Sequence, residues 1–316
     1  MAERALRTVT RTQGNNRDLT SGLVRPRRYQ LEFVDVPVLV QAFRRMVRRL
    51  EFDVCEMAVT TYLCAKEHGI AFTALPIFLV RGFHHGAVVV NTAAGITNPT
   101  DLAGRTVGVS RGYTVTTGVW ARGVLRDEYG LDLDKVTWAP SGDEHVAEYA
   151  PPPNVRPLPA GSPDLAELVS TGALDAAVGS SVDAPGVAPL IPDAAEAGYA
   201  ALRARGHYPI NHLVVVRDEL LDAYPDLAAD LFEAFTSSKQ RYVRRLRDGA
   251  VDNPTSVDRT HERVMRITGA DPLPYGLEDN RAVLEEIVRH ATDQGILTRP
   301  VALETLFAEG TQELRG

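Results

Sequence analysis

Residues 77–120 read IFLVRGFHHGAVVVNTAAGITNPTDLAGRTVGVSRGYTVTTGVW, in which three apolar runs alternate with polar turns. The first run ends at Arg81, shortly before His84 and His85, and the third run ends at Arg111. Cationic and proton-carrying side chains therefore follow the carboxyl ends of runs that have the pattern of buried strands. In an open α/β sheet, ligands bind at that edge. This stretch predicts an α/β fold with a binding site for an anionic ligand such as a carboxylate.

The composition is that of an ordinary globular protein. The 316 residues are 44% hydrophobic and 24% charged, with a formal net charge of −7. This length is sufficient for two lobes, each with its own core. A protein that binds nucleic acid is usually basic, so we expect no nucleic-acid partner. Basic clusters at residues 25–28 and 44–49 are interpreted as solvated surface, because core-like apolar residues interrupt the charge.

Neither an export signal nor a membrane segment is indicated by the sequence. Residues 1–16, MAERALRTVTRTQGNN, lack the apolar core of a signal peptide, and no apolar run approaches the length that spans a bilayer. We therefore expect a cytoplasmic protein without a membrane partner. Cys55 and Cys64 do not have the spacing of a CxxC pair, and we expect both to be buried. A homo-oligomer is compatible with the sequence.

Short apolar runs alternate with helical patterns along the whole chain, which is typical of an α/β protein with largely parallel sheets. We expect strands at 29–34, 52–55, 74–79, 87–91, 106–110, 173–178 and 210–216, and helices at 38–50, 58–68, 115–129, 165–171, 227–246 and 280–294. The middle of the chain is interpreted as an insertion between two strands of the first lobe. The predicted lobes are 1–90, 91–211 (inserted) and 212–316 (completing the first lobe), with a ligand cleft between them.

Five stretches of the chain resemble a known family. They are FDVCEMAVTTYLCAKEHG (52–69), ALPIFLVRGFHHGAVVVN (74–91), DLAGRTVGVSRGYTVTTGVWARGVLRDEYG (101–130), GHYPINHLVVVRDELLDAYPDLAADLFEAF (206–235) and GLEDNRAVLEEIVRHATDQGIL (276–297). In this order they resemble the 4,5-dihydroxyphthalate decarboxylase family over roughly residues 12 to 310. The resemblance implies a two-lobed type II periplasmic-binding-protein-like fold and the loss of CO2 from an aromatic dicarboxylate. At Asn16, His84 and Asn211 the chain departs from the family's residues, which concerns the substrate more than the fold.

Three residues are catalytic candidates. Glu56 follows a predicted strand and precedes a predicted helix, where it can accept a phenolic proton or orient a histidine; the alternative is a carboxylate that stabilises the helix N-terminus. His85 lies where the family carries its histidine. His84 and His85 point in opposite directions if the chain is extended, so at most one of them faces the ligand directly. His212, at the second crossing between the lobes, can exchange a proton with a ligand or instead be a buried histidine bonded to a backbone carbonyl.

Substrate-binding candidates lie around the same strand ends. Arg81 can hold a carboxylate through its two-pronged guanidinium, or form a salt bridge. Arg111, Tyr113, Thr116 and Thr117 form a turn from strand to helix. Its free N–H groups and hydroxyls can bind an anion without a metal, and simple helix capping is the alternative.

Further candidates for contact with the ligand are aromatic or neutral. Trp120 lies on the same helix face as Thr117 and is either a stacking platform for an aromatic ring or a core residue. His84 and Asn211 complete the substrate-binding set. Ser180 and Ser181 end a predicted strand and are weaker candidates as hydroxyl donors.

The sequence contains no HExxH, GxSxG, P-loop or GxGxxG motif, and we predict neither a metal nor a cofactor. The resulting hypothesis is a cofactor-independent decarboxylase of a hydroxylated aromatic carboxylic acid, similar to 4,5-dihydroxyphthalate. In this hypothesis an arginine binds a carboxylate of the substrate, and a histidine protonates the ring carbon. Glu56 orients that histidine or relays a proton. The alternative is a cytoplasmic solute-binding or ligand-sensing protein for a small aromatic or carboxylate ligand.

Overall fold

A computed structural model of the chain describes residues 4–180 and 183–316, and the chain divides into two compact units. The predicted cysteine environment is confirmed, since Cys55 and Cys64 are both buried and free. Unit 1 consists of Met1–Arg81, Arg205–Glu285 and Val301–Gly316, and unit 2 consists of Gly82–Ala204 and Glu286–Pro300.

These units begin and end at different residues from the lobes expected from the sequence. The chain passes from unit 1 to unit 2 after Arg81 and returns at Arg205, whereas the sequence placed these crossings near Asn91 and Asn211. The first difference arises because strand β5 (Val88–Asn91) pairs with strands of the unit 2 sheet. An apolar run identifies a strand but carries no information on which sheet the strand joins.

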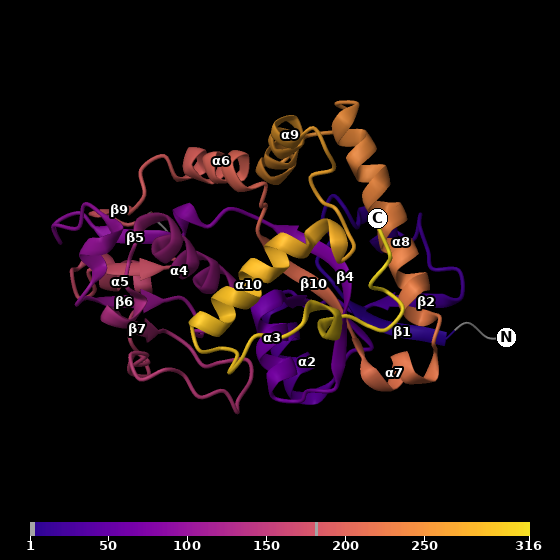
Figure 1. The fold of residues 1–316 in the computed structure, drawn as a ribbon, viewed down its shortest axis with the longest axis horizontal. Helices are drawn as coiled ribbons and strands as arrows, with labels where there is room; N and C mark the ends of the chain where they lie inside the picture. The colour runs from indigo at the N-terminus through magenta and orange to yellow at the C-terminus, as the bar shows by residue number, and fades with distance from the viewer. Residues whose placement is uncertain (1–3, 181–182) are drawn as a thin grey trace. The chain divides into compact units, whose positions relative to one another are not determined.

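Unit 1 is built on a five-stranded sheet with the order β2-β1-β3-β10-β4 (Figure 1). Strand β1 runs parallel to β2 and β3, and β10 runs antiparallel to β3 and β4. The sheet is therefore mixed, whereas the sequence predicted largely parallel sheets. The apolar pattern of a strand is the same in both directions and does not show which way the strand runs. The strands are β1 (Arg4–Val9), β2 (Tyr29–Phe33), β3 (Val54–Ala58), β4 (Phe72–Arg81) and β10 (Ile210–Arg217).

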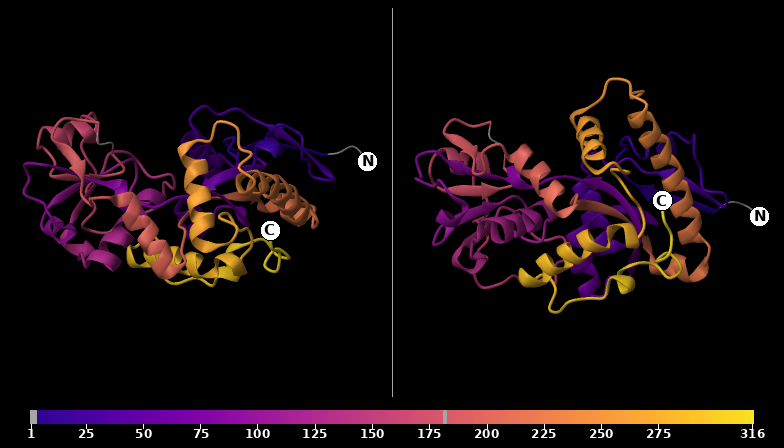
Figure 2. Two further views of the ribbon diagram at one scale, coloured as in Figure 1. Left: turned by 90° about the horizontal axis from the view of Figure 1, so that it is seen from above. Right: turned by 45° about the horizontal axis from the view of Figure 1, so that its top comes forward.

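The core of unit 1 forms around β3, all five residues of which are buried. Helices α8 and α9 lie side by side, as Figure 2 shows in orange, and the rings of Tyr242 and His261 meet edge to face with centroids 5.9 Å apart. The helices of unit 1 are α1 (Arg17–Thr20), α2 (Leu39–Arg49), α3 (Val59–Glu67), α7 (Asp218–Ala223), α8 (Leu227–Arg247) and α9 (Ser256–Thr268).

Unit 2 contains a second five-stranded sheet with the order β7-β6-β8-β5-β9. Its strands are β5, β6 (Thr106–Val109), β7 (Thr137–Pro140), β8 (Ala176–Val178) and β9 (Val187–Pro189), and its helices are α4 (Thr116–Tyr129), α5 (Leu165–Ser170), α6 (Ala194–Arg205) and the later part of α10 (Arg281–Asp293). Strand β6 is parallel to β7 and β8. Their carboxyl ends therefore meet at one edge of the sheet.

Helices α4 and α5 cover opposite faces of this sheet, because successive residues of a strand point to opposite sides. A Cβ atom on Gly108 would lie 2.6 Å from the side chain of Leu165 in α5, while Val109 faces Gly118 in α4. A glycine at position 108 is therefore required for α5 to pack this closely. No helix in the two described ranges is long and apolar enough to cross a membrane.

Candidate functional site

Glu56 and His212 form a hydrogen-bonded pair on the unit 1 sheet. The Nδ1 atom of His212 lies 2.7 Å from Oε1 of Glu56. Glu56 lies opposite Val214 in the β3–β10 ladder, so His212, two residues away from Val214, projects from the same face. Glu56 is within β3 rather than after a strand as expected, and it is 1% exposed. The side chain of His212 is 21% exposed, so the pair joins a buried carboxylate to an accessible ring.

The loop after β1 surrounds the Glu56 carboxylate with donors. Oε2 accepts a hydrogen bond from the Thr10 hydroxyl (2.8 Å) and from the backbone N–H of Arg11 (2.9 Å), and Oε1 accepts one from Gln13 Nε2 (3.5 Å). Asn16 supports this loop, since its side chain donates to the Thr10 hydroxyl and accepts from the backbone of Gln13. Both carboxylate oxygens are held in place, and the orientation of the His212 ring is fixed with them.

The contact with Glu56 assigns the roles of the two ring nitrogens of His212. A carboxylate partner places a proton on Nδ1, which leaves Nε2 as the nitrogen that exchanges a proton. Across residues 4–180 and 183–316, Nε2 of His212 makes no hydrogen bond or ion pair. A ring of this kind can act as a general base when neutral and as a general acid when protonated.

A cavity of about 320 Å³ lies in unit 1 at the carboxyl ends of the parallel strands β1 and β2. Thr10, which donates to Glu56, lines the cavity. Leu39 of α2 also lines it, and one turn along that helix Phe43 packs edge-on against the His212 ring, with centroids 5.2 Å apart. The volume is that of a site for a small ligand such as one substituted ring.

Arg81 is buried and its guanidinium is occupied by the protein itself. It donates to the backbone oxygens of Tyr208 (2.9 Å) and Pro274 (3.0 Å) and to the side-chain oxygen of Asn280. Burial lowers the pKa of Arg81 to about 10. These contacts are those of a residue that ties β4 to distant segments of unit 1, and they do not resemble an open carboxylate anchor.

The turn expected to bind an anion in unit 2 holds a carboxylate of the chain. The Glu144 carboxylate accepts hydrogen bonds from the backbone N–H groups of Tyr113 and Thr114 and, at 2.6 Å, from the Thr114 hydroxyl. A Cβ atom on Gly112 would lie 2.5 Å from this carboxylate, so the close approach needs a glycine. Arg111 has a φ of 65° and is exposed. Thr116 and Thr117 begin α4, the former buried and the latter half-buried.

A larger cavity of about 940 Å³ opens within unit 2 at the carboxyl ends of β6, β7 and β8. Ser110, Ser141, Glu144 and Ser180 contribute to its wall, so polar groups do gather where the strand pattern indicated. Ser181, the other hydroxyl candidate, lies outside the described residues.

The two adjacent histidines and Trp120 occupy buried positions in unit 2. The His84 ring stacks on Trp120 with an interplanar angle of 5°, and Trp120 is 1% exposed, so it is a core residue. His85 Nε2 lies 2.9 Å from Oε2 of Glu128, and its buried Nδ1 has no hydrogen-bond partner among the residues that the structure describes. Asn211 is half-buried in β10, next to His212.

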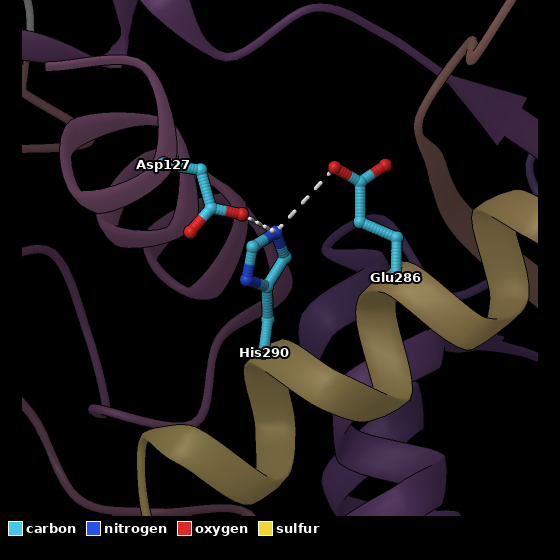
Figure 3. A group of neighbouring side chains, drawn as sticks. All are labelled: Asp127, Glu286 and His290. Carbon is cyan, nitrogen blue, oxygen red and sulfur yellow. Dashed lines mark ion pairs between the residues drawn. The ribbon is translucent and has the colours of Figure 1, made fainter. Parts of the chain in front are cut away.

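Among the described residues, one group of side chains has possible metal-ligand atoms within 4.8 Å of one another. It consists of Asp127, Glu286 and His290. Figure 3 shows the His290 ring between the two carboxylates, with Nε2 3.9 Å from Asp127 and 3.8 Å from Glu286. Arg126, which can only donate, lies 3.3 Å from Nδ1 and thus places the ring proton on Nε2. Arg126 and Arg289 also bind Asp127. A metal would need a deprotonated Nε2, so this cluster is organised as an ion-pair network.

Comparison with known proteins gives two curated relatives, and no family model matches the chain. A 4,5-dihydroxyphthalate decarboxylase of Comamonas testosteroni is 26% identical over 309 residues, which cover 90% of this chain and 92% of the relative. One of Pseudomonas putida is 30% identical over 163 residues, 48% of this chain and 62% of the relative. The chain is similar to two 4,5-dihydroxyphthalate decarboxylases. The resemblance inferred from the sequence is thereby confirmed.

Solved structures confirm the predicted fold class. The periplasmic aliphatic sulphonate-binding protein SsuA of Escherichia coli superposes with a TM-score of 0.57 at 13% identity, covering 100% of this chain and 95% of that one. The desulfurization enzyme DSZB superposes with a TM-score of 0.56 at 18% identity, covering 98% of each chain. The chain therefore has the periplasmic-binding-protein-like fold, which both a binding protein and an enzyme adopt.

Several residues around these sites were not found from the sequence. Thr10, Arg11 and Gln13 follow β1, a strand with two arginines and a threonine in six residues and so without the apolar run used to find strands. Had β1 been recognised, the polar segment TRTQGNN after it would have indicated another strand-end site. The sequence around Glu128 and Glu144 has no pattern that predicts a functional role. Each of them contacts a partner that is distant in the sequence and is brought close only by folding.

Proposed function

We propose that this protein is a cofactor-independent decarboxylase of a hydroxylated aromatic carboxylic acid, of the kind named for its two relatives. The observation that carries the proposal is the Glu56–His212 pair, in which a buried carboxylate orients an accessible ring. Thr10, which donates to the same carboxylate, also lines a cavity of about 320 Å³. The similarity to a named decarboxylase over nine-tenths of the chain supports the same reaction class.

The chemistry needs a proton at the ring carbon that carries the leaving carboxylate. A phenolic oxygen supplies electron density to the ring, and protonated His212 gives its Nε2 proton to that carbon. The bond to the carboxylate then breaks, CO2 leaves, and the bonding electrons restore the aromatic ring. Glu56 keeps the Nδ1 proton in place and stabilises the charged ring before the transfer. A positioned acid of this kind contributes on the order of 10² to 10⁴ in rate.

Replacement of His212 tests the proposal against a binding protein with the same fold. His212→Gln removes the titrating ring and retains a polar side chain, so an enzyme should lose CO2 release from 4,5-dihydroxyphthalate and related hydroxyaromatic acids but keep binding them in calorimetry. The control is Glu32→Gln, at an exposed position of β2 outside the candidate site. If the wild-type protein binds these acids but releases CO2 from none of them, the proposed decarboxylase function is wrong. The alternative of a ligand-binding protein then remains.

A further inference from the structure

The 320 Å³ cavity of unit 1 carries two opposite charges that do not pair with each other. Arg11 and Asp35 both line it, and both side chains belong to exposed residues. In the part of the chain that the structure describes, neither the Arg11 guanidinium nor the Asp35 carboxylate forms an ion pair or a hydrogen bond. A guanidinium and a carboxylate within 4.0 Å would be an ion pair, so the two groups line one cavity while remaining apart.

The position of Arg11 is fixed by the catalytic pair rather than by its own side chain. Its backbone N–H donates to Oε2 of Glu56 at 2.9 Å, and the preceding Thr10 donates to the same oxygen. Arg11 is therefore anchored at its backbone within the cavity wall, and among the residues that the structure describes its guanidinium has no partner. Asp35 follows β2, whose carboxyl end lies beside that of β1.

The remainder of the wall suits a flat ring with polar edges. Phe33 and Leu39 are apolar, and the hydroxyl groups of Thr10, Thr12 and Thr20 add neutral donors and acceptors. A guanidinium binds a carboxylate through two parallel hydrogen bonds, and a carboxylate accepts hydrogen bonds from phenolic hydroxyls. The cavity wall thus offers a guanidinium for an acid group and a carboxylate for a hydroxyl group.

We propose that Arg11 binds the carboxylate that the substrate keeps, and that Asp35 accepts a hydrogen bond from a ring hydroxyl. This inference rests on the proposed decarboxylation, because 4,5-dihydroxyphthalate has two equivalent carboxylates and loses one as CO2. The product, 3,4-dihydroxybenzoate, retains one carboxylate and both hydroxyls, and so it retains both contacts. Arg11 and Asp35 are then specificity-determining residues, and the product is a competitive inhibitor whose inhibition constant lies near the KM of the substrate.

Calorimetric titration with three probes tests each contact without turnover. The probes are 3,4-dihydroxybenzoate, benzoate without hydroxyls, and catechol without a carboxylate. Arg11→Gln should weaken 3,4-dihydroxybenzoate and benzoate by about tenfold to a hundredfold, the range for lost charge-assisted hydrogen bonds, and leave catechol unchanged. Asp35→Asn should weaken 3,4-dihydroxybenzoate and catechol and leave benzoate unchanged. Arg49→Gln, an exposed arginine of α2 that does not line the cavity, is the matched control.

The outcomes separate this inference from the proposed function. Wild-type affinity of the Arg11→Gln variant for 3,4-dihydroxybenzoate, with an unchanged melting temperature, overturns the inference even if CO2 is released. Selective loss of the carboxylate-bearing probes supports it, and it does so even if no acid is decarboxylated, in which case only the reaction fails. Equal weakening of all three probes by Arg11→Gln also overturns it, because Arg11 would then act through the Glu56 loop and not on the carboxylate.

Discussion

The Nδ1 atom of His212 lies 2.7 Å from Oε1 of Glu56, although the two residues are 156 positions apart in the chain. The contact exists because β10 inserts antiparallel between β3 and β4, which brings a strand from the returning part of the chain beside a strand from the first part. Removal of either residue leaves the other without the partner that sets its role.

Replacement of Glu56 by glutamine should slow catalysis far more than it weakens binding. The amide retains an acceptor for the Nδ1 proton but loses the charge that stabilises the protonated ring of His212. We expect kcat for CO2 release to fall by about tenfold to a hundredfold, with a change in ligand affinity below threefold. Glu32→Gln, at an exposed position of β2, is the control and should behave as wild type. Equal losses in kcat and in ligand affinity would instead make Glu56 a purely structural residue of the loop after β1.

Replacement of Arg81 by methionine should destabilise unit 1. The backbone oxygens of Tyr208 and Pro274 and the side-chain oxygen of Asn280 would each lose a buried donor. Part of that cost is offset, since a buried cation is removed as well. We expect the free energy of unfolding to fall by about 2 to 4 kcal/mol in urea titration. Arg49→Gln is again the control. A variant with unchanged stability and a raised KM would restore Arg81 to the carboxylate-anchoring role that the sequence suggested.

Replacement of Gly112 by alanine should displace the Glu144 carboxylate from its donors. The added Cβ atom would lie 2.5 Å from a carboxylate oxygen, and the N–H groups of Tyr113 and Thr114 would lose their acceptor. We expect a loss of about 1 to 3 kcal/mol in the free energy of unfolding, the cost of leaving buried donors unpaired. Gly82→Ala places a Cβ where no atom lies within 4 Å and should leave stability unchanged. Equal stability of the two variants would mean that Glu144 finds the same donors from a shifted position.

The sequence predicted candidate site residues at the ends of strands. It did not predict which strands pair with each other or which of these side chains come into contact. Glu56 and His212 could be proposed because the family resemblance covers both positions and because each is a polar residue in or beside an apolar run. Their contact could not, because the apolar pattern of β10 does not state its neighbours or its direction. The turn at Tyr113 was predicted to bind an anion, and the Glu144 carboxylate occupies its donors in the structure. A segment thirty residues away carries no local sign of that contact.

The helical patterns located one late helix closely, but they did not predict which unit it joins and they missed another helix. The expected helix 280–294 is α10 (Arg281–Asp293), so the amphipathic pattern located it within a residue or two. The same pattern gave no reason to expect that residues 286–300 join unit 2. Helix α9 was missed, because its polar face is broad, with three arginines among thirteen residues. Its stability comes from a capping box at Thr255 and Asp258 and from contacts with α8.

The free energy of unfolding should decrease as the pH falls from about 6.5 to about 4, and His290 should account for part of that decrease. Burial lowers the pKa of His290 to about 4, whereas the unfolded chain titrates near the ordinary value of 6.5. Between these values the unfolded state binds a proton that the folded state does not, so stability is fully present above pH 6.5 and is lost toward pH 4. At 1.4 kcal/mol for each unit, the loss is about 3 kcal/mol. Urea titrations of wild type and His290→Gln at pH 8, 6, 5 and 4 measure it.

At pH 8 both proteins carry no charge at position 290, and the difference between them gives the cost of the altered contacts with Trp120. That difference should shrink toward pH 4, because only the wild-type chain has a histidine at position 290 that gains a proton on unfolding. His261, whose pKa is likewise lowered to about 4 by burial, provides a second case in unit 1, and His261→Gln should show the same convergence. A difference between wild type and His290→Gln that is the same at all four pH values would mean that His290 has the same pKa in the folded and the unfolded protein. A difference that grows between pH 8 and pH 6 would mean that the cluster with Asp127 and Glu286 holds an imidazolium.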